Sequence, residues 1–531
     1  MDVQNWQNKR QYSPDQIALA RHVLAEIQNG MEVKEAVRKN PLPEGGYIGK
    51  HLLVSVYRDI VEKGEQPADS ELLARIRLKP VRTLSGVTTV TVLTKPYPCP
   101  GECIFCPTDV RMPKSYLPDE PGAMRALQHE FEPYNQVSAR IAALEAVGHP
   151  TDKIELLILG GTWSAYRRDY QEWFVQRCLD GLNQSDSSDL EEAQRINETT
   201  THRNVGMVIE TRPDHIDNGE LVWMRKLGVT KVQMGVQSFD DNILEINRRG
   251  HSGAQTREAV NLLRAAGFKI VLHWMPNLLG ASLESDRKDF SLLWEGVCPD
   301  EIKIYPTQLL ENADLYTYWE RREYTPYSTE ELIELIADLK ETIPRYCRVN
   351  RVVRDIPSTN VVEGNKRTSL RQDIQLEMKK RGTVCNCIRC REVRGESVDI
   401  NDLHLDDLIY FSDNSEEHFL FFKTGGDKLA AFLRLTLPGD NSPSTGMVDL
   451  ENAAIIREMH VYGQSLPVGV EAQGAAQHIG MGSKLLIEAE RIARERNFKQ
   501  IAVISAIGTK RYYEKRAFER GELYLVKTFD K

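Results

Sequence analysis

The start of the chain carries apolar residues at helical spacing. In segment 14–30 (PDQIALARHVLAEIQNG) they recur every three or four positions, and the segment ends in glycine, a common helix stop. The runs VKEAVRKN and HLLVSVYRDIVEKG continue the pattern. Residues 1–84 are therefore predicted to form a helical N-terminal region with a basic end.

After residue 84 the pattern changes to short β-rich runs that alternate with amphipathic helical stretches, such as MRALQHEFEPYNQVSARIAALEAVG and EAVNLLRAAG. Strands joined by helical crossovers favour a parallel sheet, so residues 85–310 are predicted to form a partial parallel (β/α)6 barrel. The predicted strands are Val87–Thr94, Ile154–Leu159, Val205–Ile209, Lys231–Val236, Lys269–His273 and Glu301–Ile304.

The rest of the chain divides into two further predicted regions. Residues 311–400 have the pattern of a linker that contains a helix (EELIELIADLKETI) and a basic stretch. Residues 401–531 are predicted to be a separate α/β module that begins with the β-rich runs IYF and HFLFFK. The predicted fold class is thus a multidomain α/β protein.

Composition narrows the class of protein. The 531 residues are 41% hydrophobic and 27% charged, which is ordinary for a soluble globular protein, and no apolar run is long enough to span a membrane. The polar start lacks the apolar core of a signal peptide. The net charge of −9 gives no global attraction to nucleic acid, so an RNA contact would need a local basic surface.

The cysteines favour metal binding in a reducing compartment over a disulfide framework. Their number, nine, is odd, and six of them lie in two tight clusters. Because no membrane segment is expected either, we predict a cytoplasmic protein.

The first cluster, Cys99, Cys103 and Cys106, has the spacing C-x3-C-x2-C directly after the first predicted strand. Three thiolates on one loop can bind three irons of a [4Fe–4S] cluster and leave the fourth iron open to a substrate or cofactor. A structural zinc site would close with a fourth Cys or His, and none follows nearby. The spacing resembles that of the radical S-adenosylmethionine (SAM) superfamily, whose members bind SAM at the open iron.

Unusual residues also follow the other predicted strands, where barrels of this kind gather their chemistry. Arg212 can bind a carboxylate or phosphate as a bidentate donor, or it can form a structural ion pair. With Gln237, it is a candidate catalytic residue facing the barrel cavity. Trp163, His273 and Trp274 can stack on adenine or on a flipped base, although core packing is the commoner role.

The C-terminal module contains a candidate anion site. The strand IIREMHVYG is followed by a loop, the motif Gln477-x-x-Gly480-x-Gly482 and an amphipathic helix over 483–497. Backbone N–H groups and the helix dipole at such a turn favour a pyrophosphate. The motif resembles that of the Gcn5-related N-acetyltransferases, in which this turn binds the pyrophosphate of coenzyme A. The strand KQIAVISAIG and Tyr513 also fit that family.

Over nearly its whole length the chain resembles the catalytic subunit of Elongator in its single-chain bacterial or archaeal form. The resemblance implies an enzyme that modifies the wobble uridine of certain tRNAs. The segments that carry it are KPVRTLSGV, PGAMRA, GGTW, ETRPD, GVQS, NRRGH, KIYPT, RDIPS, REMHVYG and the final acetyltransferase helix and strand.

The resemblance also implies the chemistry. The reduced cluster cleaves SAM to a 5′-deoxyadenosyl radical, which takes a hydrogen atom from the acetyl methyl group of acetyl-CoA. The carbon radical adds to C5 of the uridine, and hydrolysis releases CoA and leaves a carboxymethyl group. The implied partners are the anticodon region of a tRNA and an electron donor, with no obligate protein subunit.

By the family pattern the three cysteines bind the cluster, and Gly160, Gly161 and Thr162 lie beside the amino group of SAM. Tyr513 is a candidate catalytic residue as well as an acetyl-CoA contact. Lys153 is far in sequence from the acetyltransferase module, so it would contact CoA across a domain interface. The implied acetyl-CoA contacts are Lys153, Glu458, Met459, His460, Val461, Gln477, Gly480, Met481, Gly482, Ser483 and Tyr513.

The second cysteine cluster, Cys385, Cys387 and Cys390, lies in the basic linker with the spacing C-x-C-x2-C and favours a structural Zn²⁺. Three free thiols are the alternative. The fourth ligand is open among Cys298, Cys347 and His404.

Two basic groups are predicted to form the tRNA surface, because clustered cations contact phosphates collectively. Solvated or ion-paired arginines are the alternative for single residues. The first group is Arg75, Arg77, Lys79 and Arg82, and the second is Arg345, Arg348, Arg351, Arg354, Lys379, Lys380 and Arg381.

Two other functions compete with tRNA modification. A protein lysine acetyltransferase with a structural iron–sulfur domain would not need an open three-cysteine loop. A tRNA-binding protein with degenerate active sites is disfavoured because the cluster cysteines and the pyrophosphate turn are intact.

Overall fold

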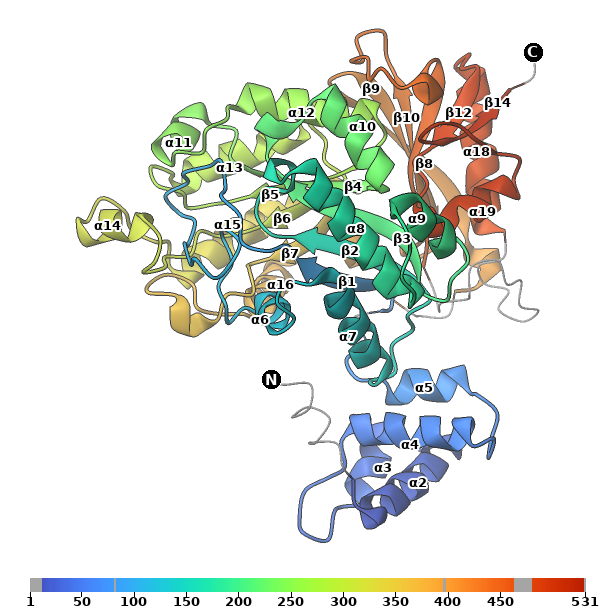
Figure 1. Ribbon diagram of the computed structural model, residues 1–531. Coiled ribbons are helices and arrows are strands. Elements are labelled where there is room, and N and C mark those ends of the chain that lie inside the picture. Colours follow the sequence, from blue (N-terminus) through green and yellow to red (C-terminus); the bar gives the residue numbers. More distant parts are fainter. Residues whose placement is uncertain (1–11, 81–82, 395–397, 463–479, 530–531) are drawn as a thin grey trace.

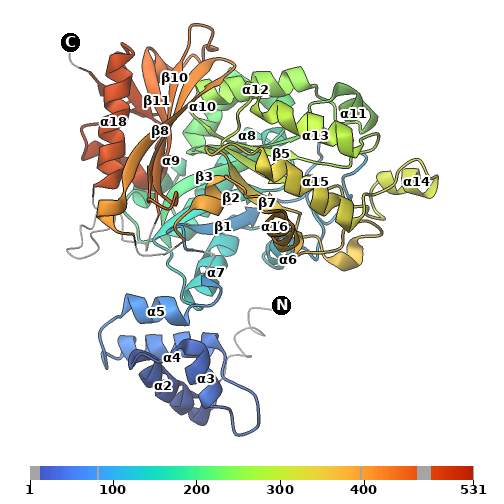
Figure 2. The same cartoon turned by 180° about the vertical axis from the view of Figure 1, so that it is seen from behind.

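The computed structural model describes residues 12–80, 83–394, 398–462 and 480–529 (Figures 1 and 2). Four N-terminal helices pack on one another as predicted. The first begins at a capping box, in which the Ser13 and Gln16 side chains each accept a hydrogen bond from the backbone N–H of the other residue. These helices are α2 (Pro14–Gln28), α3 (Val33–Lys39), α4 (Lys50–Glu62) and α5 (Ser70–Ile76).

The central module is built on a parallel sheet of seven strands in sequential order. The helices α7 (Pro133–Glu145), α8 (Arg168–Asn183) and α12 (Gly253–Ala265) pack against its strands. The strands are β1 (Thr88–Leu93), β2 (Lys153–Leu159), β3 (Arg203–Thr211), β4 (Lys231–Gln237), β5 (Lys269–Trp274), β6 (Glu301–Ile304) and β7 (Arg348–Val352).

Further helices complete the crossovers and the segment after β7. They are α6 (Pro121–Gln128), α9 (Leu190–Asn197), α10 (Asn218–Leu227), α11 (Asp241–Ile246), α13 (Leu283–Ser291), α14 (Leu315–Glu320), α15 (Thr329–Glu341), α16 (Leu370–Arg381) and α17 (Ile388–Arg391).

The predicted class is confirmed, with two differences in detail. The sheet has one strand more than expected, since β7 lies in the segment interpreted as a linker and pairs with β6. The single helix expected over 124–148 is two helices, α6 and α7. Glu130 and Phe131 take left-handed backbone angles (φ 51° and 59°), and Pro133 then starts α7.

The C-terminal module is a mixed seven-stranded sheet in the order β13-β14-β12-β11-β10-β9-β8, in which α18 (Met481–Glu495) packs on β9, β10, β11 and β12. The short helix α19 (Lys510–Glu514) precedes β13. The strands are β8 (His404–Ser412), β9 (Ser415–Lys423), β10 (Leu429–Pro438), β11 (Ala453–Val461), β12 (Gln500–Val503), β13 (Glu519–Arg520) and β14 (Leu525–Thr528).

The two sheets share one continuous apolar core and lie side by side in both views (Figures 1 and 2). The N-terminal helices attach at the turn between α7 and β2, where Arg77 Nε donates to the Gly148 carbonyl at 2.7 Å. In the described part of the chain, no helix is both long and apolar enough to cross a membrane.

Candidate active site

One cavity of about 820 Å³ is lined by the central and the C-terminal modules. Side chains from β1 to β7 enter it from the barrel, and β11 and α19 contribute Met459, His460 and Tyr513 from the second sheet. Cys106 of the cysteine loop also lines it. The cysteine loop and the acetyltransferase strand therefore face the same space.

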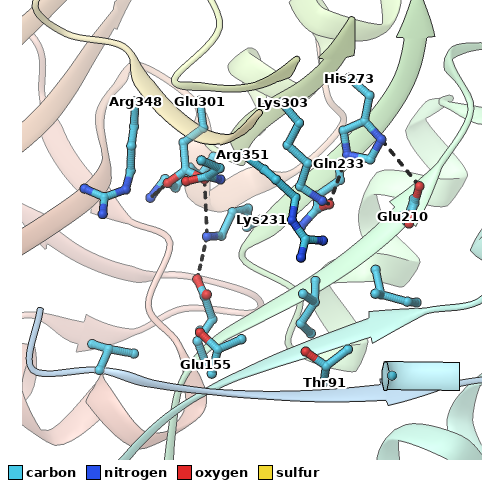
Figure 3. A pocket seen from close by; sticks show the side chains of 18 of the residues that line it. Thr91, Glu155, Glu210, Lys231, Gln233, His273, Glu301, Lys303, Arg348 and Arg351 are labelled. Atoms are coloured by element: carbon cyan, nitrogen blue, oxygen red, sulfur yellow. Dashed lines mark hydrogen bonds and ion pairs between the residues drawn. The ribbon is translucent and has the colours of Figure 1, made fainter. Parts of the chain in front are cut away.

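Polar side chains at alternate positions of buried strands form much of the cavity wall (Figure 3). Lys231 and Gln233 of β4 point inward, as do Glu301 and Lys303 of β6. In a strand, alternate residues share one face. The sequence analysis missed these residues, and charged residues spaced two apart within β-rich runs are the signal that could have found them.

A hydrogen-bonded group joins β3, β4 and β5 at the cavity. His273 Nε2 lies 3.1 Å from Gln233 Oε1, to which it donates, and its Nδ1 lies 3.4 Å from Glu210 Oε1. The acceptor nitrogen therefore faces a carboxylate. Burial, and then the charge of Lys303, holds the pKa of His273 well below its ordinary value. The imidazole is therefore neutral at neutral pH.

A chain of buried ion pairs continues from the barrel into the second sheet. Lys231 Nζ lies 2.5 Å from Glu155 and 3.6 Å from Glu301 (Figure 3). Lys269 bonds Glu301 at 2.6 Å and also pairs with Glu458 of β11. Because removing one partner leaves a buried uncompensated charge, this chain fixes how the two modules face each other.

The second half of this chain lies inside the module interface. Arg434 contacts Glu458 at 2.9 Å, and Arg457 contacts Asp300 at 2.5 Å and Glu417 at 2.8 Å. Burial alone would raise the pKa of Asp300, but Arg457 and Arg434 outweigh it and hold that pKa below its ordinary value. The carboxylate is thus charged at neutral pH.

The loop that follows β1 holds Cys99, Cys103 and Cys106. Cys103 is buried and the other two are partly exposed. Arg249 Nη1 lies 3.5 Å from Cys103 Sγ, and Thr162 Oγ1 lies 3.6 Å from Cys99 Sγ. The three thiols are not all within 4.8 Å of one another, as ligands of a single ion would be. This wider arrangement fits thiolates that each bind a different iron of one cluster.

The glycines after β2 form a tight cradle beside this loop. Gly160 and Gly161 have φ angles of 140° and 86°, which favour glycine. A Cβ on Gly160 would lie 1.8 Å from Thr94 Oγ1, so no side chain fits there. The backbone of this turn, together with Thr162, therefore lies directly beside Cys99, where a ligand of the open iron would be held.

The two candidate catalytic residues of the barrel have different surroundings. Arg212 is buried and makes two hydrogen bonds to Asp214, of 2.9 and 3.0 Å, so it forms an ion pair and does not line the cavity. Gln237 lines the cavity at the end of β4, with φ 73° and a buried Oε1 that has no hydrogen-bond partner in the described part of the chain. Backbone strain and an unused polar atom of this kind are common at binding positions.

The acetyltransferase turn lies at the N-terminus of α18. Gly480 caps the helix with φ 98°, and Met481, Gly482 and Ser483 form its first turn. Ser483 Oγ accepts hydrogen bonds from Arg516 at 3.3 and 3.2 Å. A Cβ on Gly482 would lie 2.7 Å from Tyr512 Oη. Gln477 lies outside the described residues.

Among the described residues, one edge of the strand β11 next to this turn is unpaired over part of its length. Its pairing with β12 covers Ala453 to Ile456, whereas β10 pairs along it as far as Val461. An unpaired strand edge can bind an extended chain that carries amide groups. Burial lowers the pKa of His460 to about 4, so this cavity-lining side chain is neutral at neutral pH.

The remaining predicted side chains have mixed surroundings. Lys153 is partly buried at the start of β2, where burial lowers its pKa, and it does not line the described cavity. Tyr513 lines the cavity, and burial raises its pKa. Trp274 is fully buried and donates to Asp289 at 2.6 Å, and Trp163 is 2% exposed. Both tryptophans therefore pack in the core and are not open to a base.

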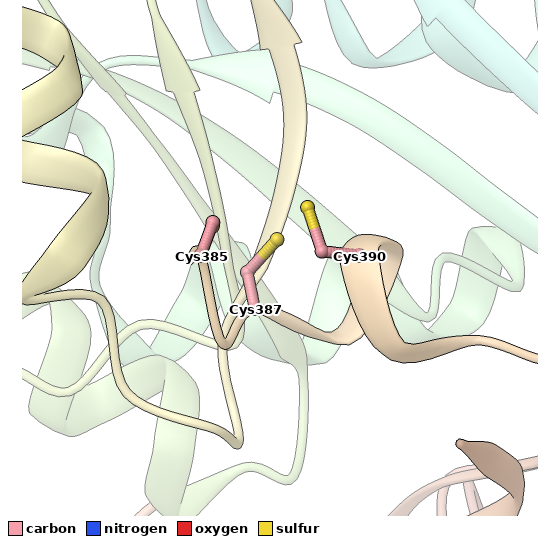
Figure 4. Close-up of side chains that lie close together, drawn as sticks. All are labelled: Cys385, Cys387 and Cys390. Atoms are coloured by element: carbon pink, nitrogen blue, oxygen red, sulfur yellow. The ribbon is translucent and has the colours of Figure 1, made fainter. Parts of the chain in front are cut away.

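The linker cysteines meet as three thiols whose sulfur atoms lie within 4.8 Å of one another (Figure 4). Such an arrangement suits one metal ion. None of Cys298, Cys347 and His404 belongs to this group. The Lys340 Nζ is buried and has no hydrogen-bond partner among the described residues, and its charge lowers the pKa of Cys387 after the hydrogen bonds from Cys385 and Cys390. A buried cation beside three thiols fits a thiolate–metal complex.

The first basic group is largely used inside the protein. Arg75 donates to the carbonyls of Ile27 and Met31 at 2.9 and 2.8 Å, and Arg77 donates to the carbonyl of Gly148. Lys79 is exposed, and Arg82 lies outside the described residues.

The second basic group is split among three places. Arg348, Arg351 and Arg354 line the cavity, and Arg348 and Arg354 pair with Glu392 and Glu120 at 2.8 and 3.2 Å. At the end of α16, Lys380 and Arg381 pair with Glu377 at 3.4 and 2.9 Å, and Lys379 is exposed. Arg345 pairs with Asp427. Arg389 and Arg394, which the sequence analysis did not select, line the cavity.

Family models match the barrel module, and similar proteins cover most of the chain. Residues 97–293 match the Radical SAM superfamily, and residues 299–380 match the Radical_SAM C-terminal domain. The chain is 43% identical to a tRNA uridine(34) acetyltransferase of Methanocaldococcus jannaschii, over 88% of this chain and 89% of the relative. It is 41% identical to a protein of the same name from Dehalococcoides mccartyi, over 85% of this chain and 99% of the relative.

A eukaryotic relative and a solved structure agree with these matches. Elongator complex protein 3 of Bos taurus is 35% identical over 86% of this chain and 87% of its own length. The solved structure of an archaeal Elp3 from Methanocaldococcus infernus, with an N-terminal deletion, superposes with a TM-score of 0.73. It is 40% identical and covers 84% of this chain and 100% of that one.

Proposed function

This chain belongs to the family of tRNA uridine(34) acetyltransferases and Elongator complex protein 3, and from that premise we propose that it attaches a carboxymethyl group to C5 of the wobble uridine of tRNA. The carbon atoms come from acetyl-CoA. Membership in the radical SAM family implies a [4Fe–4S] cluster and SAM, and when bound these supply the hydrogen-abstracting radical.

One observation carries the proposal: the cysteine loop, the barrel strands and β11 of the acetyltransferase sheet line the same cavity. A ligand held at the loop and an acetyl group held at β11 would therefore share one cavity. A protein lysine acetyltransferase would not need this shared space, and the named relatives are tRNA-modifying enzymes or Elongator subunits.

Residues of the barrel would bind the cluster, SAM and a ligand in the cavity. Cys99, Cys103 and Cys106 would hold the cluster, and the backbone of Gly160 and Gly161 would hold SAM beside it. The role of Gln237 is to donate to or accept from a ligand inside the cavity, through the amide whose Oε1 is unpaired.

On the acetyltransferase side, the N-terminus of α18 and the unpaired edge of β11 would hold acetyl-CoA. Glu210 and the neutral His273 would offer hydrogen-bonding groups to a ligand held in the cavity. Tyr513 closes the cavity wall between the two modules. Lys153, at the start of β2, is a further proposed CoA contact on the barrel side.

Nucleoside analysis tests the function. Unmodified tRNA is incubated without oxygen with the protein, a reductant, SAM and acetyl-CoA, and its nucleosides are separated by mass spectrometry. We expect a carboxymethyl mass increase on uridine 34 that requires both SAM and acetyl-CoA. Acetylated lysine on a protein substrate with unchanged tRNA would instead support the competing function.

For the linker cysteines we propose a structural Zn²⁺, and Cys387→Ser is expected to lose it. Metal analysis should find zinc in addition to iron in the parent protein and a loss of zinc in the variant. Because a structural metal contributes folding free energy, the Tm should fall by about 5–10 °C. The matched control is Cys347→Ala, a buried thiol outside the three-sulfur group. Full zinc content in Cys387→Ser would contradict the site.

The tRNA phosphates are proposed to contact cations that line the cavity, among them the exposed Arg394 and the partly exposed Arg351, which pairs with Asp355. The α16 cations would form a second patch. Reversing Arg351 and Arg394 to glutamate should weaken tRNA binding. The slope of log K against the logarithm of the salt concentration should become less steep by about 0.7–0.9 for each lost phosphate contact. Arg75→Gln is the control, since its guanidinium already binds two backbone carbonyls. Binding that is insensitive to salt and to the reversals would show that RNA lies elsewhere.

A further inference from the structure

Two guanidinium groups approach the cysteine loop from inside the barrel. Arg249 Nη1 lies 3.5 Å from Cys103 Sγ, and its side chain is buried. Arg212 Nη1 is buried and has no hydrogen-bond partner in the described part of the chain. A Cβ on Gly101 would lie 2.1 Å from this nitrogen and 3.6 Å from Cys103 Sγ. The unused donor of Arg212 therefore points directly at the loop.

Both groups are fixed in place by bonds on their other side. Arg212 makes its two bonds to Asp214, and its Nη2 donates to the Arg249 carbonyl at 2.8 Å. Arg249 Nε donates to the Gly235 carbonyl at 3.1 Å. Such bonds hold the positive charges at a constant distance from the loop, as preorganised groups require.

The local charge is positive. Asp214 neutralises one of the two guanidinium groups, and the other has no carboxylate partner among the described residues. His251 is buried beside them, where burial and then the charges of Arg249 and Arg212 lower its pKa to about 3. It is therefore neutral at neutral pH. The net charge at the inner side of the loop is one positive unit.

We propose that Arg249, assisted by Arg212, raises the reduction potential of the cluster bound at Cys99, Cys103 and Cys106. Reduction adds one negative charge, and a buried positive charge near a ligand sulfur stabilises that more negative form. The N–H donated to Cys103 acts in the same direction. These are positioning residues, and the proposal rests on the proposed function only in requiring that the cluster binds at this loop.

The test is a redox titration of the reconstituted protein without SAM, followed by electron paramagnetic resonance, for Arg249→Met and Arg249→Lys. Methionine removes the charge with little loss of volume, whereas lysine keeps the charge. At a fixed potential, we expect the ratio of reduced to oxidised cluster to fall by about tenfold or more in Arg249→Met, a shift of about 59 mV for one electron. Arg249→Lys should stay close to the parent. Arg212→Met should shift in the same direction by less, since Asp214 already offsets its charge.

Iron content, measured on every sample, separates the outcomes. A cluster-loaded Arg249→Met with an unchanged potential would overturn the proposal, as would an equal shift in the methionine and lysine variants. Weaker SAM binding at an unchanged potential would also overturn it, by assigning the guanidinium to SAM. If Arg249→Met does not load iron, the potentials of Arg212→Met and Arg212→Lys are compared instead. A lower potential in the methionine variant alone supports the proposal, and equal or unchanged potentials overturn it. A parent protein that binds no cluster would instead contradict the proposed function.

Discussion

Cys103→Ser is expected to reduce 5′-deoxyadenosine formation from SAM to background. The thiol is buried, and it is the cysteine of the loop that Arg249 contacts, at 3.5 Å. A serine hydroxyl stays protonated and is a poor iron ligand, so one iron would lose its protein ligand. The measurement is anaerobic SAM cleavage by reconstituted protein, with iron content determined for each sample.

Cys178→Ala is the matched control for Cys103→Ser. Cys178 is a fully buried thiol of α8 that packs in the core, away from the cavity. This variant should keep both its iron and its SAM cleavage. Undiminished deoxyadenosine formation by iron-loaded Cys103→Ser would remove the loop from the active site.

Gly482→Val is expected to lower acetyl-CoA turnover by about 10²-fold while tRNA binding persists. Gly482 is the second residue of α18, where backbone N–H groups would face the CoA pyrophosphate. A branched side chain there blocks the close approach of the phosphates and pushes against Tyr512, and displacements of this size cost about that factor. The measurement is release of free CoA in the presence of tRNA.

Gly219→Val gives a control at the same helical position. Gly219 is the second residue of α10, is exposed and does not line the cavity. Its replacement should leave CoA release near the parent rate. Equal losses in both variants would mean that Gly482→Val acts through helix stability, and unchanged CoA release in Gly482→Val would place acetyl-CoA elsewhere.

The sequence predicted the parts of the site that lie on contiguous motifs. The cysteine loop and the turn before α18 each combine several informative residues within a few positions, so their spacing indicated an iron–sulfur site and an anion site. The glycine turn after β2 was assigned to SAM only through the family resemblance. Family resemblance then joined the two modules. Tyr513 was found only through that resemblance, because nothing local distinguishes a buried tyrosine that lines a cavity from one that packs in a core.

The cavity wall could not be predicted in the same way. Glu155, Lys231 and Glu301 lie on different strands and become one ion-paired group only when the sheet brings them together. The strand β7 was interpreted as linker because arginines at Arg348 and Arg351 interrupt its apolar pattern. Those arginines face the cavity. The same charged side chains therefore obscured the strand pattern in the sequence and line the site in the structure.

The interpretation of Arg212 shows a further limit. From sequence, a carboxylate or phosphate ligand and a structural ion pair were both open. The structure pairs it with Asp214 two residues later and directs its remaining nitrogen at Gly101. A sequence motif identifies an arginine near a site, but its partner depends on side-chain directions that only the folded loop determines.

The shared cavity is tested most directly by following hydrogen between the two modules. Acetyl-CoA with a fully deuterated acetyl methyl group is incubated with the protein, reductant, SAM and tRNA, and the 5′-deoxyadenosine formed is analysed by mass spectrometry. We expect one deuterium atom in this product, and no deuterium when acetyl-CoA is omitted or the Gly482→Val variant is used. If the protein forms deoxyadenosine from the deuterated mixture without deuterium, the radical does not reach the acetyl group and the shared cavity is not the active site.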